Sequence, residues 1–182
     1  MAKAVPSWTA EELARLPEGY RYEIERGELI VREPTGIRHG GTAGRICILL
    51  GGFVAEHGLG LVLAAETGFF LQRDPDTVRA PDVAFISRER LDQIRDPDTF
   101  GTAPPDLAVE VLSPRQYLSD LRSKVDEYLR CGVRSVWVAD PRRRTLHQYR
   151  RGEERQYTEA AELVEDAVLP GFACRLADLF VI

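Results

Sequence analysis

The chain contains no asparagine and only two lysines, Lys3 and Lys124, against 22 arginines. Genomic bias explains this pattern better than adaptation to heat, because hyperthermophile proteins are more commonly enriched in lysine. Arginine is therefore the default cation of this protein. A lysine placed in mid-chain, Lys124, becomes a candidate for a role that a planar guanidinium cannot fill.

Cysteine is also scarce. Cys47, Cys131 and Cys174 are odd in number and far apart, which argues against a disulfide framework or a zinc site and favours a reducing cytoplasm. The longest apolar run, about 46–55, is interrupted by glycines and is too short to cross a bilayer. The first residues carry no signal-peptide block, so we expect a cytoplasmic protein with no membrane partner.

The length of 182 residues predicts one domain over 1–182. The net charge of −5 excludes a surface that is basic throughout. Segment 142–155 nevertheless holds six arginines against two glutamates. It is compatible with contact to a phosphate backbone and equally with a solvated, arginine-rich hairpin.

Local patterns predict a mixed α/β fold. TAEE at Thr9–Glu12 predicts a capping box that opens a short helix, and Arg26-Gly27 predicts the turn of an N-terminal hairpin. The remaining predicted elements are a helix over 39–57 ended by Gly58, strands over 61–72, 78–87 and 106–113, a helix over 116–130, a strand over 133–140, its hairpin partner 145–150, and a short edge element with a final turn in the tail. This order predicts one central mixed sheet, a right-handed βαβ unit and a C-terminal antiparallel extension.

Two of these strands each carry a single acid among apolar residues. Glu110 lies in LAVEVL and Asp82 in APDVAFI. An ionised carboxylate buried without partners costs several kcal/mol, so each acid is either paired with arginine, placed at an edge or turn, or held there for a function. Two acids on neighbouring buried strands would repel each other, and a hard divalent cation such as Mg²⁺ resolves that conflict.

Lys124 follows on the helix after the Glu110 strand. From that helix a flexible ammonium could reach the acids and stabilise charge on a phosphodiester. An ion pair with Asp120, one turn earlier, is the alternative that a solvated helix face would give.

The motifs APDVAFIS, APPDLAVEVLSP and YLSDLRSKVDEYLRCGVRSVWVADP resemble the Uma2-like (DUF820) family of the PD-(D/E)XK nuclease superfamily, and YEIERGELI and PGFACRLADLF resemble its leading and closing motifs. The resemblance covers nearly the whole chain. It implies a restriction-endonuclease-like αβββαβ core and Mg²⁺-dependent (or Mn²⁺-dependent) hydrolysis of DNA. It also implies a homo-oligomer, with a dimer as the expected state.

The resemblance further implies site residues. Asp82 matches the motif aspartate, Glu110 the acid of (D/E)XK, and the Val111 carbonyl a third metal ligand. The chain departs from the pattern at Leu112, where the superfamily has lysine, and Lys124 resembles a migrated replacement. Further candidates near the metal or the catalytic groups are Glu23, His39, Glu66 and Asp120.

Two functions follow. The first is a metal-dependent endonuclease that uses Asp82, Glu110 and Lys124. The second, favoured by Leu112 and the acidic net charge, is a catalytically inactive nuclease-fold module that binds nucleic acid or a protein. No Gly-rich phosphate loop, nucleophile elbow or His/Cys zinc spacing supports other chemistry.

Overall fold

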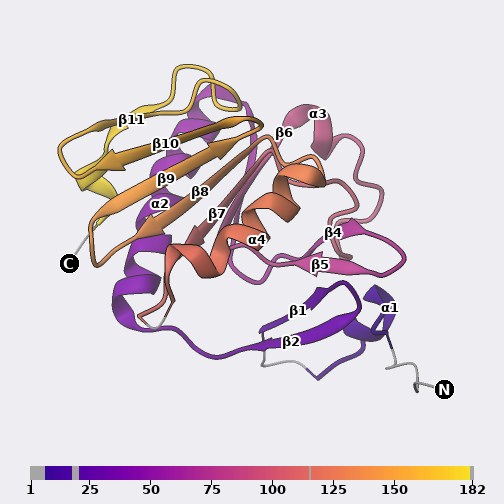
Figure 1. Cartoon of the computed structure of the whole chain (residues 1–182). Helices are drawn as coiled ribbons and strands as arrows, with labels where there is room; N and C mark the ends of the chain where they lie inside the picture. The colour runs from indigo at the N-terminus through magenta and orange to yellow at the C-terminus, as the bar shows by residue number, and fades with distance from the viewer. Residues whose placement is uncertain (1–6, 18–20, 115, 181–182) are drawn as a thin grey trace.

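A six-stranded mixed sheet in the order β10-β9-β8-β7-β6-β3 forms the centre of the molecule (Figure 1). The structure is a computed structural model that describes residues 7–17, 21–114 and 116–180. The strands are β3 (Gly60–Ala64), β6 (Val83–Ser87), β7 (Leu107–Val111), β8 (Ser135–Asp140), β9 (Thr145–Arg150) and β10 (Glu153–Thr158). β7 and β8 pair in parallel and the other neighbours are antiparallel, so the predicted βαβ unit and antiparallel extension are confirmed.

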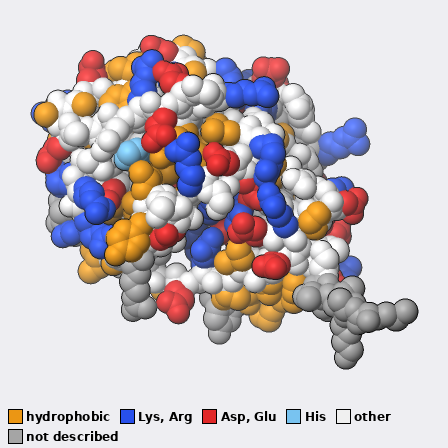
Figure 2. All heavy atoms as spheres, in the orientation of Figure 1, with side chains coloured by type: hydrophobic (Ala, Val, Ile, Leu, Met, Phe, Trp, Pro, Cys, Tyr) orange, Lys and Arg blue, Asp and Glu red, His pale blue; other side chains and the backbone are white. Residues whose placement is uncertain are grey.

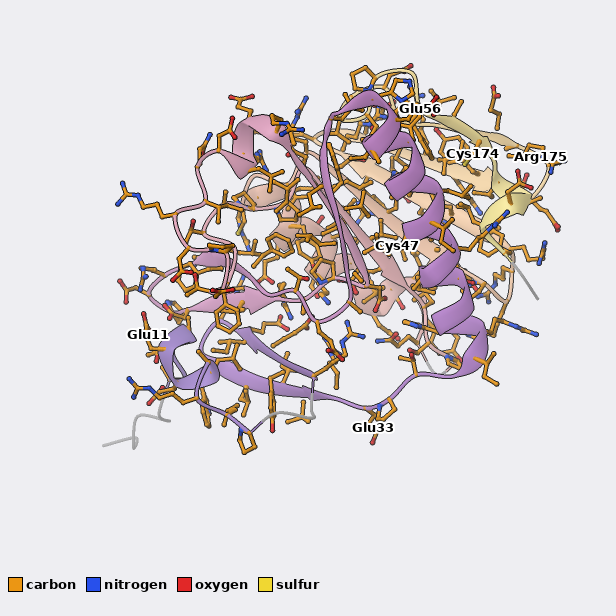
Figure 3. The ribbon with its side chains drawn as sticks, turned by 180° about the vertical axis from the view of Figure 1, so that it is seen from behind. Glu11, Glu33, Cys47, Glu56, Cys174 and Arg175 are labelled. Atoms are coloured by element: carbon orange, nitrogen blue, oxygen red, sulfur yellow. The ribbon has the colours of Figure 1, made fainter. Side chains whose placement is uncertain are left out.

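Helices α2 (Ile37–His57) and α4 (Leu118–Arg130) cover opposite faces of this sheet (Figures 1 and 3). Side chains alternate between the two faces of a strand. Accordingly Val109 and Val111 of β7 join the core beneath α2, whereas Ala108 and Leu112 join the core beneath α4. Glu110, two residues from each of the latter, therefore points toward α4.

The order α2, β3, β6, β7, α4, β8 is the expected αβββαβ core, and the N-terminal hairpin precedes it. The hairpin strands β1 (Arg21–Glu25) and β2 (Glu28–Arg32) are joined by Arg26 and Gly27, both at positive φ. Two consecutive positive φ values are typical of the tight turns that match strand twist. The capping box of α1 (Ala10–Leu13) and the left-handed Gly58 that ends α2 are confirmed as well.

Two predicted strands were wrong in extent. The runs 61–72 and 78–87 each break, and their inner halves form the hairpin β4 (Phe69–Gln72) and β5 (Thr77–Arg79). This hairpin joins β1 and β2 in a second sheet, ordered β2-β1-β5-β4. Pro81 lacks an N–H and restricts the residue before it, which accounts for the break between β5 and β6. Asp82 therefore lies just before β6, at the junction of the two sheets.

Four short elements remain in the part of the chain that the structure describes. They are α3 (Arg88–Leu91), β11 (Glu162–Val164), β12 (Ala173–Arg175) and the 3₁₀ helix η1 (Leu176–Leu179). Cys47, Cys131 and Cys174 are free thiols. Within the described ranges, no helix combines the length and the apolar character needed to cross a bilayer.

The arginine-rich segment forms most of the β9–β10 hairpin, and carboxylates neutralise much of its charge. Arg143 pairs with Asp140 at 2.8 Å, and Arg144 pairs with Glu159 at 2.8 Å. Arg150 pairs with the buried Glu165 at 2.7 Å. Acidic and basic side chains are interspersed over this face in Figure 2. These ion pairs are of the kind expected in a solvated, arginine-rich hairpin.

Candidate active site

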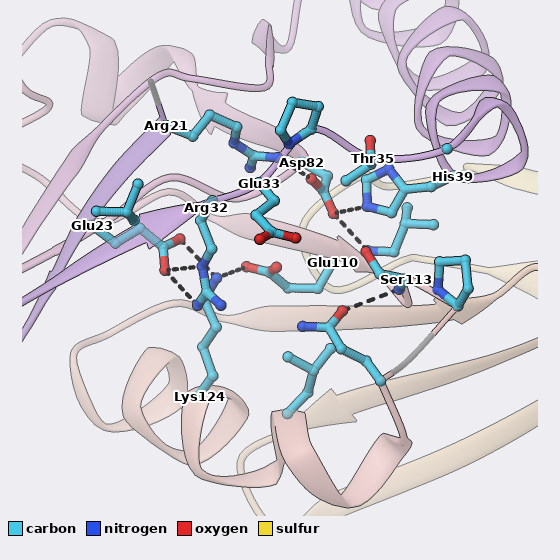
Figure 4. Close-up of a pocket in the computed structure, with 17 residues that line it drawn as sticks. Arg21, Glu23, Arg32, Glu33, Thr35, His39, Asp82, Glu110, Ser113 and Lys124 are labelled. Atoms are coloured by element: carbon cyan, nitrogen blue, oxygen red, sulfur yellow. Dashed lines mark hydrogen bonds and ion pairs between the residues drawn. The ribbon is translucent and has the colours of Figure 1, made fainter. Parts of the chain in front are cut away.

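A cavity of about 500 Å³ opens where β1 and β2 meet the ends of β6 and β7 (Figure 4). The N-terminus of α2 and the inner face of α4 complete its wall. Its charged and titratable lining residues are Arg21, Glu23, Arg32, Glu33, His39, Asp82, Glu110 and Lys124. Elements that are far apart in the sequence therefore bring most of the predicted site residues into one pocket.

Asp82 is held from three sides. Its Oδ2 accepts the Val111 amide at 2.8 Å and lies 3.2 Å from Nε2 of His39, while Arg21 donates to its Oδ1 at 3.1 Å. Burial alone would raise the pKa of Asp82, but the hydrogen bonds from His39 and Val111 and the charge of Arg21 together lower it. Asp82 is therefore an oriented carboxylate that stays ionised.

Glu110 has a different environment from Asp82. Its Oε1 accepts a hydrogen bond from the Tyr128 hydroxyl at 2.8 Å and lies 2.7 Å from Nζ of Lys124. Burial raises the pKa of Glu110; Lys124 offsets part of this effect, and the neighbouring charges of Asp82 and Glu23 add to it. Glu110 is thus a buried carboxylate with Lys124 as its cationic partner and with two further carboxylates, Asp82 and Glu23, near it.

Lys124 bridges two carboxylates. Its Nζ donates to Oε1 of Glu23 at 2.8 Å and contacts Glu110 at 2.7 Å, and the side chain is buried. Burial would lower the pKa of Lys124, but the two glutamates raise it above its ordinary value. The ammonium therefore stays charged, as an electrostatic role requires.

Glu23 is 1% exposed and belongs to a larger ion network. Its Oε2 accepts from Arg32 at 2.9 Å and from Arg79 at 3.3 Å, and its Oε1 also accepts the Ala80 amide at 3.2 Å. Burial would raise the pKa of Glu23, but Lys124, Arg32 and Arg79 together lower it well below its usual range. With three cationic partners, Glu23 is an anchor for the ammonium.

The structure separates two predicted residues from this pocket. Glu66 was expected in a strand beside Asp82, but it lies at positive φ in the exposed turn between β3 and β4 and lines a neighbouring cavity of about 640 Å³. Asp120 was expected to hold the ammonium, but it is exposed and accepts the Tyr117 amide at 2.7 Å at the start of α4. A carboxylate at that position of a helix satisfies an otherwise unpaired amide.

Leu112, at the pattern's lysine position, is 3% exposed and packs with Leu121 and Val138 beneath α4. An ammonium there would lie among apolar side chains. Lys124, one helical turn beyond Leu121, reaches Glu110 from the helix instead. The structure thus places the Lys124 ammonium of α4, and not a side chain at position 112, next to Glu110.

Sequence reasoning missed the four polar partners that organise the pocket, namely Arg21, Arg32, Arg79 and Glu127. No signal distinguishes these arginines from the other arginines of the chain. Tyr128 of α4 is 0% exposed; its ring packs between the helix and the sheet, and its hydroxyl donates to Glu110.

The pocket fits a hard divalent cation. Asp82, Glu110 and the Val111 backbone supply oxygen atoms within one pocket, although no cluster of three or more His, Cys, Asp or Glu side chains forms a metal site among the described residues. Mg²⁺ needs only one or two carboxylates when water and phosphate complete its shell. Nδ1 of His39 and Nε of Arg21 are buried without a hydrogen-bond partner in the described ranges.

Comparison with known proteins identifies the family and the fold. Residues 10–177 match the model of the Uma2 family, described as "Putative restriction endonuclease". The fold is similar to the crystal structure of "a putative nuclease belonging to DUF820" from Anabaena variabilis, with a TM-score of 0.80, 19% identity, and coverage of 95% of this chain and 97% of that one. Among curated proteins, no sequence matches the chain.

Proposed function

Because the chain belongs to the Uma2 family, we propose that it is a metal-dependent nuclease that hydrolyses DNA phosphodiester bonds in the Asp82–Glu110 pocket. One observation carries the proposal: the pocket holds an oriented carboxylate, a second buried carboxylate, and an ammonium 2.7 Å from the latter. The nuclease-like fold of the Anabaena variabilis protein supports it. The three free thiols support a reducing compartment such as the cytoplasm.

Asp82, Glu110 and the Val111 carbonyl would hold Mg²⁺ or Mn²⁺. Such an ion, when bound, polarises the phosphate and lowers the pKa of a water molecule. Arg21, His39 and the Val111 amide fix the Asp82 carboxylate in its orientation. The Tyr128 hydroxyl does the same for Glu110.

Lys124 provides positive charge where the pentacovalent phosphate develops negative charge. A compact ammonium serves this purpose because it can turn toward more than one oxygen atom, whereas a guanidinium is a rigid fork. Preorganised charges of this kind contribute a large share of catalysis, since they need no rearrangement during the reaction. This role gives a reason for lysine in a chain that otherwise uses arginine.

Cleavage of supercoiled plasmid with Mg²⁺ or Mn²⁺ tests the proposal. We expect nicked or linear products from the wild-type protein and from Glu56→Gln, an exposed carboxylate of α2 far from the pocket (Figure 3). Asp82→Asn and Glu110→Gln should lose cleavage by a factor of at least about 100. Intact plasmid with folded wild-type protein, or equal cleavage by all variants, would favour the inactive nucleic-acid- or protein-binding module.

A further inference from the structure

Arg79 is the most deeply enclosed cation of the network around the pocket, with 1% of its surface exposed. Each nitrogen of its guanidinium contacts a different carboxylate: Nε lies 2.6 Å from Glu127, Nη1 3.3 Å from Glu23 and Nη2 2.9 Å from Glu25. The planar fork of arginine suits three fixed partners, whereas an ammonium is a point charge.

These contacts join the two sides of the Lys124 ion pair. Glu127 lies three residues after Lys124 on α4, so its bond to Arg79 fixes the helix that carries the lysine. Glu23 of β1 accepts from both Arg79 and Lys124, so Arg79 also fixes the partner that receives the ammonium. One buried side chain on β5 therefore contacts both the helix that carries Lys124 and the carboxylate that accepts its ammonium.

Glu110 cannot hold the ammonium in place alone. Its Oε1 is shared between Tyr128 and Lys124, and Glu110 is the carboxylate that a metal would engage under the proposed function. A lysine with Glu110 as its sole partner would lose that partner on metal binding. Glu23 is partly neutralised by Arg32 and Arg79 and is not one of the proposed metal ligands. It can therefore keep its bond to the ammonium when a metal binds.

We propose that Arg79 is the positioning residue for Lys124, acting through Glu23 and Glu127. The fork holds α4 and β1 at a fixed separation and keeps the ammonium beside the metal-binding carboxylate. The catalytic importance of Lys124 rests on the proposed function, but its placement by Arg79 does not. The two claims are therefore separable by experiment.

The scarcity of lysine makes the placement directly measurable. In a Lys3→Arg protein, Lys124 is the sole lysine, so labelling with ¹⁵N-lysine gives one side-chain ammonium signal by NMR. Two variants weaken the contacts through which Arg79 would position Lys124. Arg79→Lys keeps the charge but loses the fork; it also adds a second lysine signal, which a further Lys124→Arg substitution in that background identifies. Glu127→Gln removes the charge on α4. Glu25→Gln is the matched control, because Glu25 contacts the same guanidinium but has 40% of its side chain exposed and lies outside the Lys124 pair.

We expect Arg79→Lys and Glu127→Gln to move the Lys124 signal and to speed exchange of its ammonium protons by about tenfold, as loss of a buried charged hydrogen bond would. Glu25→Gln should leave exchange within about twofold, because its pair is partly solvated. If the signal and its exchange stay unchanged in folded Arg79→Lys and Glu127→Gln, Arg79 has only a structural role and the proposal is wrong. Equal changes in Glu25→Gln and Glu127→Gln would also overturn it.

If Arg79→Lys does not fold, the pair Glu127→Gln and Glu25→Gln decides the question. Cleavage gives a second readout: Glu127→Gln should lower kcat and leave KM for DNA unchanged. An inactive wild-type protein would refute the proposed function and leave the NMR result valid.

Discussion

The ammonium of Lys124 lies 2.7 Å from Oε1 of Glu110, although the two residues come from different elements, α4 and β7. Residue 112, where the nuclease pattern has its lysine, is a leucine packed in the core beneath the same helix. The positive charge beside Glu110 therefore comes from α4 and not from residue 112.

Two substitutions of Lys124 distinguish the contribution of its positive charge from that of its compact ammonium shape. Lys124→Met leaves Glu23 and Glu110 buried beside each other, and loss of one partner of a buried ion pair typically costs about 3–5 kcal/mol. Lys124→Arg keeps the charge and should retain more of the free energy of unfolding, but we expect both variants to lose cleavage. Urea unfolding with the plasmid assay checks this. Full activity of Lys124→Arg would contradict the special role of the ammonium.

Returning lysine to the pattern position should not restore the site. Leu112→Lys places an ammonium among apolar side chains beneath α4, so we expect lower stability and no rescue when it is combined with Lys124→Met. Leu112→Met, which conserves volume, is the control. Recovery of cleavage in the double variant would show that the cation can come from either position.

Low pH should weaken the ion network because it protonates the Glu23 carboxylate. The folded protein holds the pKa of Glu23 below its ordinary value of 4.5, so its contribution is complete above that pH and is lost as the pH falls further. Glu23→Gln should therefore be much less stable than wild type at pH 7, with a difference that shrinks below pH 4.5. Unfolding by urea at a series of pH values measures it, and a difference independent of pH would contradict the ion-pair explanation.

The arginine hairpin should contribute little to DNA binding. Arg143, Arg144 and Arg155 already contact carboxylates, so replacing all three with glutamine should change affinity by less than about threefold. Fluorescence anisotropy with a labelled duplex and Mg²⁺ replaced by Ca²⁺ is suitable. A loss of tenfold or more, together with a smaller dependence on salt, would assign the phosphate contacts to this hairpin.

Much of the core was predictable because its signals are local. The apolar run around Glu110 predicted a strand buried on both faces, and β7 is buried at every position. The capping box, the Arg26-Gly27 turn and Gly58 each depend on neighbouring residues alone. The pairing of Glu110 with Lys124 could also be predicted from the sequence, because a helix that follows a strand packs back on the sheet.

The rest depends on contacts between distant segments. Whether the run 61–72 continues or turns at Glu66 is decided by which sheet each half joins, and that information is absent from the run itself. Arg79 resembles every other arginine in the sequence. Its burial follows from three glutamates, Glu23, Glu25 and Glu127, that only the folded chain brings together.

Titration of Mn²⁺ into the protein, with and without a short DNA duplex, tests the central claim most directly. We predict heat of binding in wild type and in Glu56→Gln that disappears in Asp82→Asn and in Glu110→Gln, whose folding is verified by circular dichroism. Absence of binding in wild type even with DNA present, or binding that survives both substitutions, would contradict a metal site at these two carboxylates.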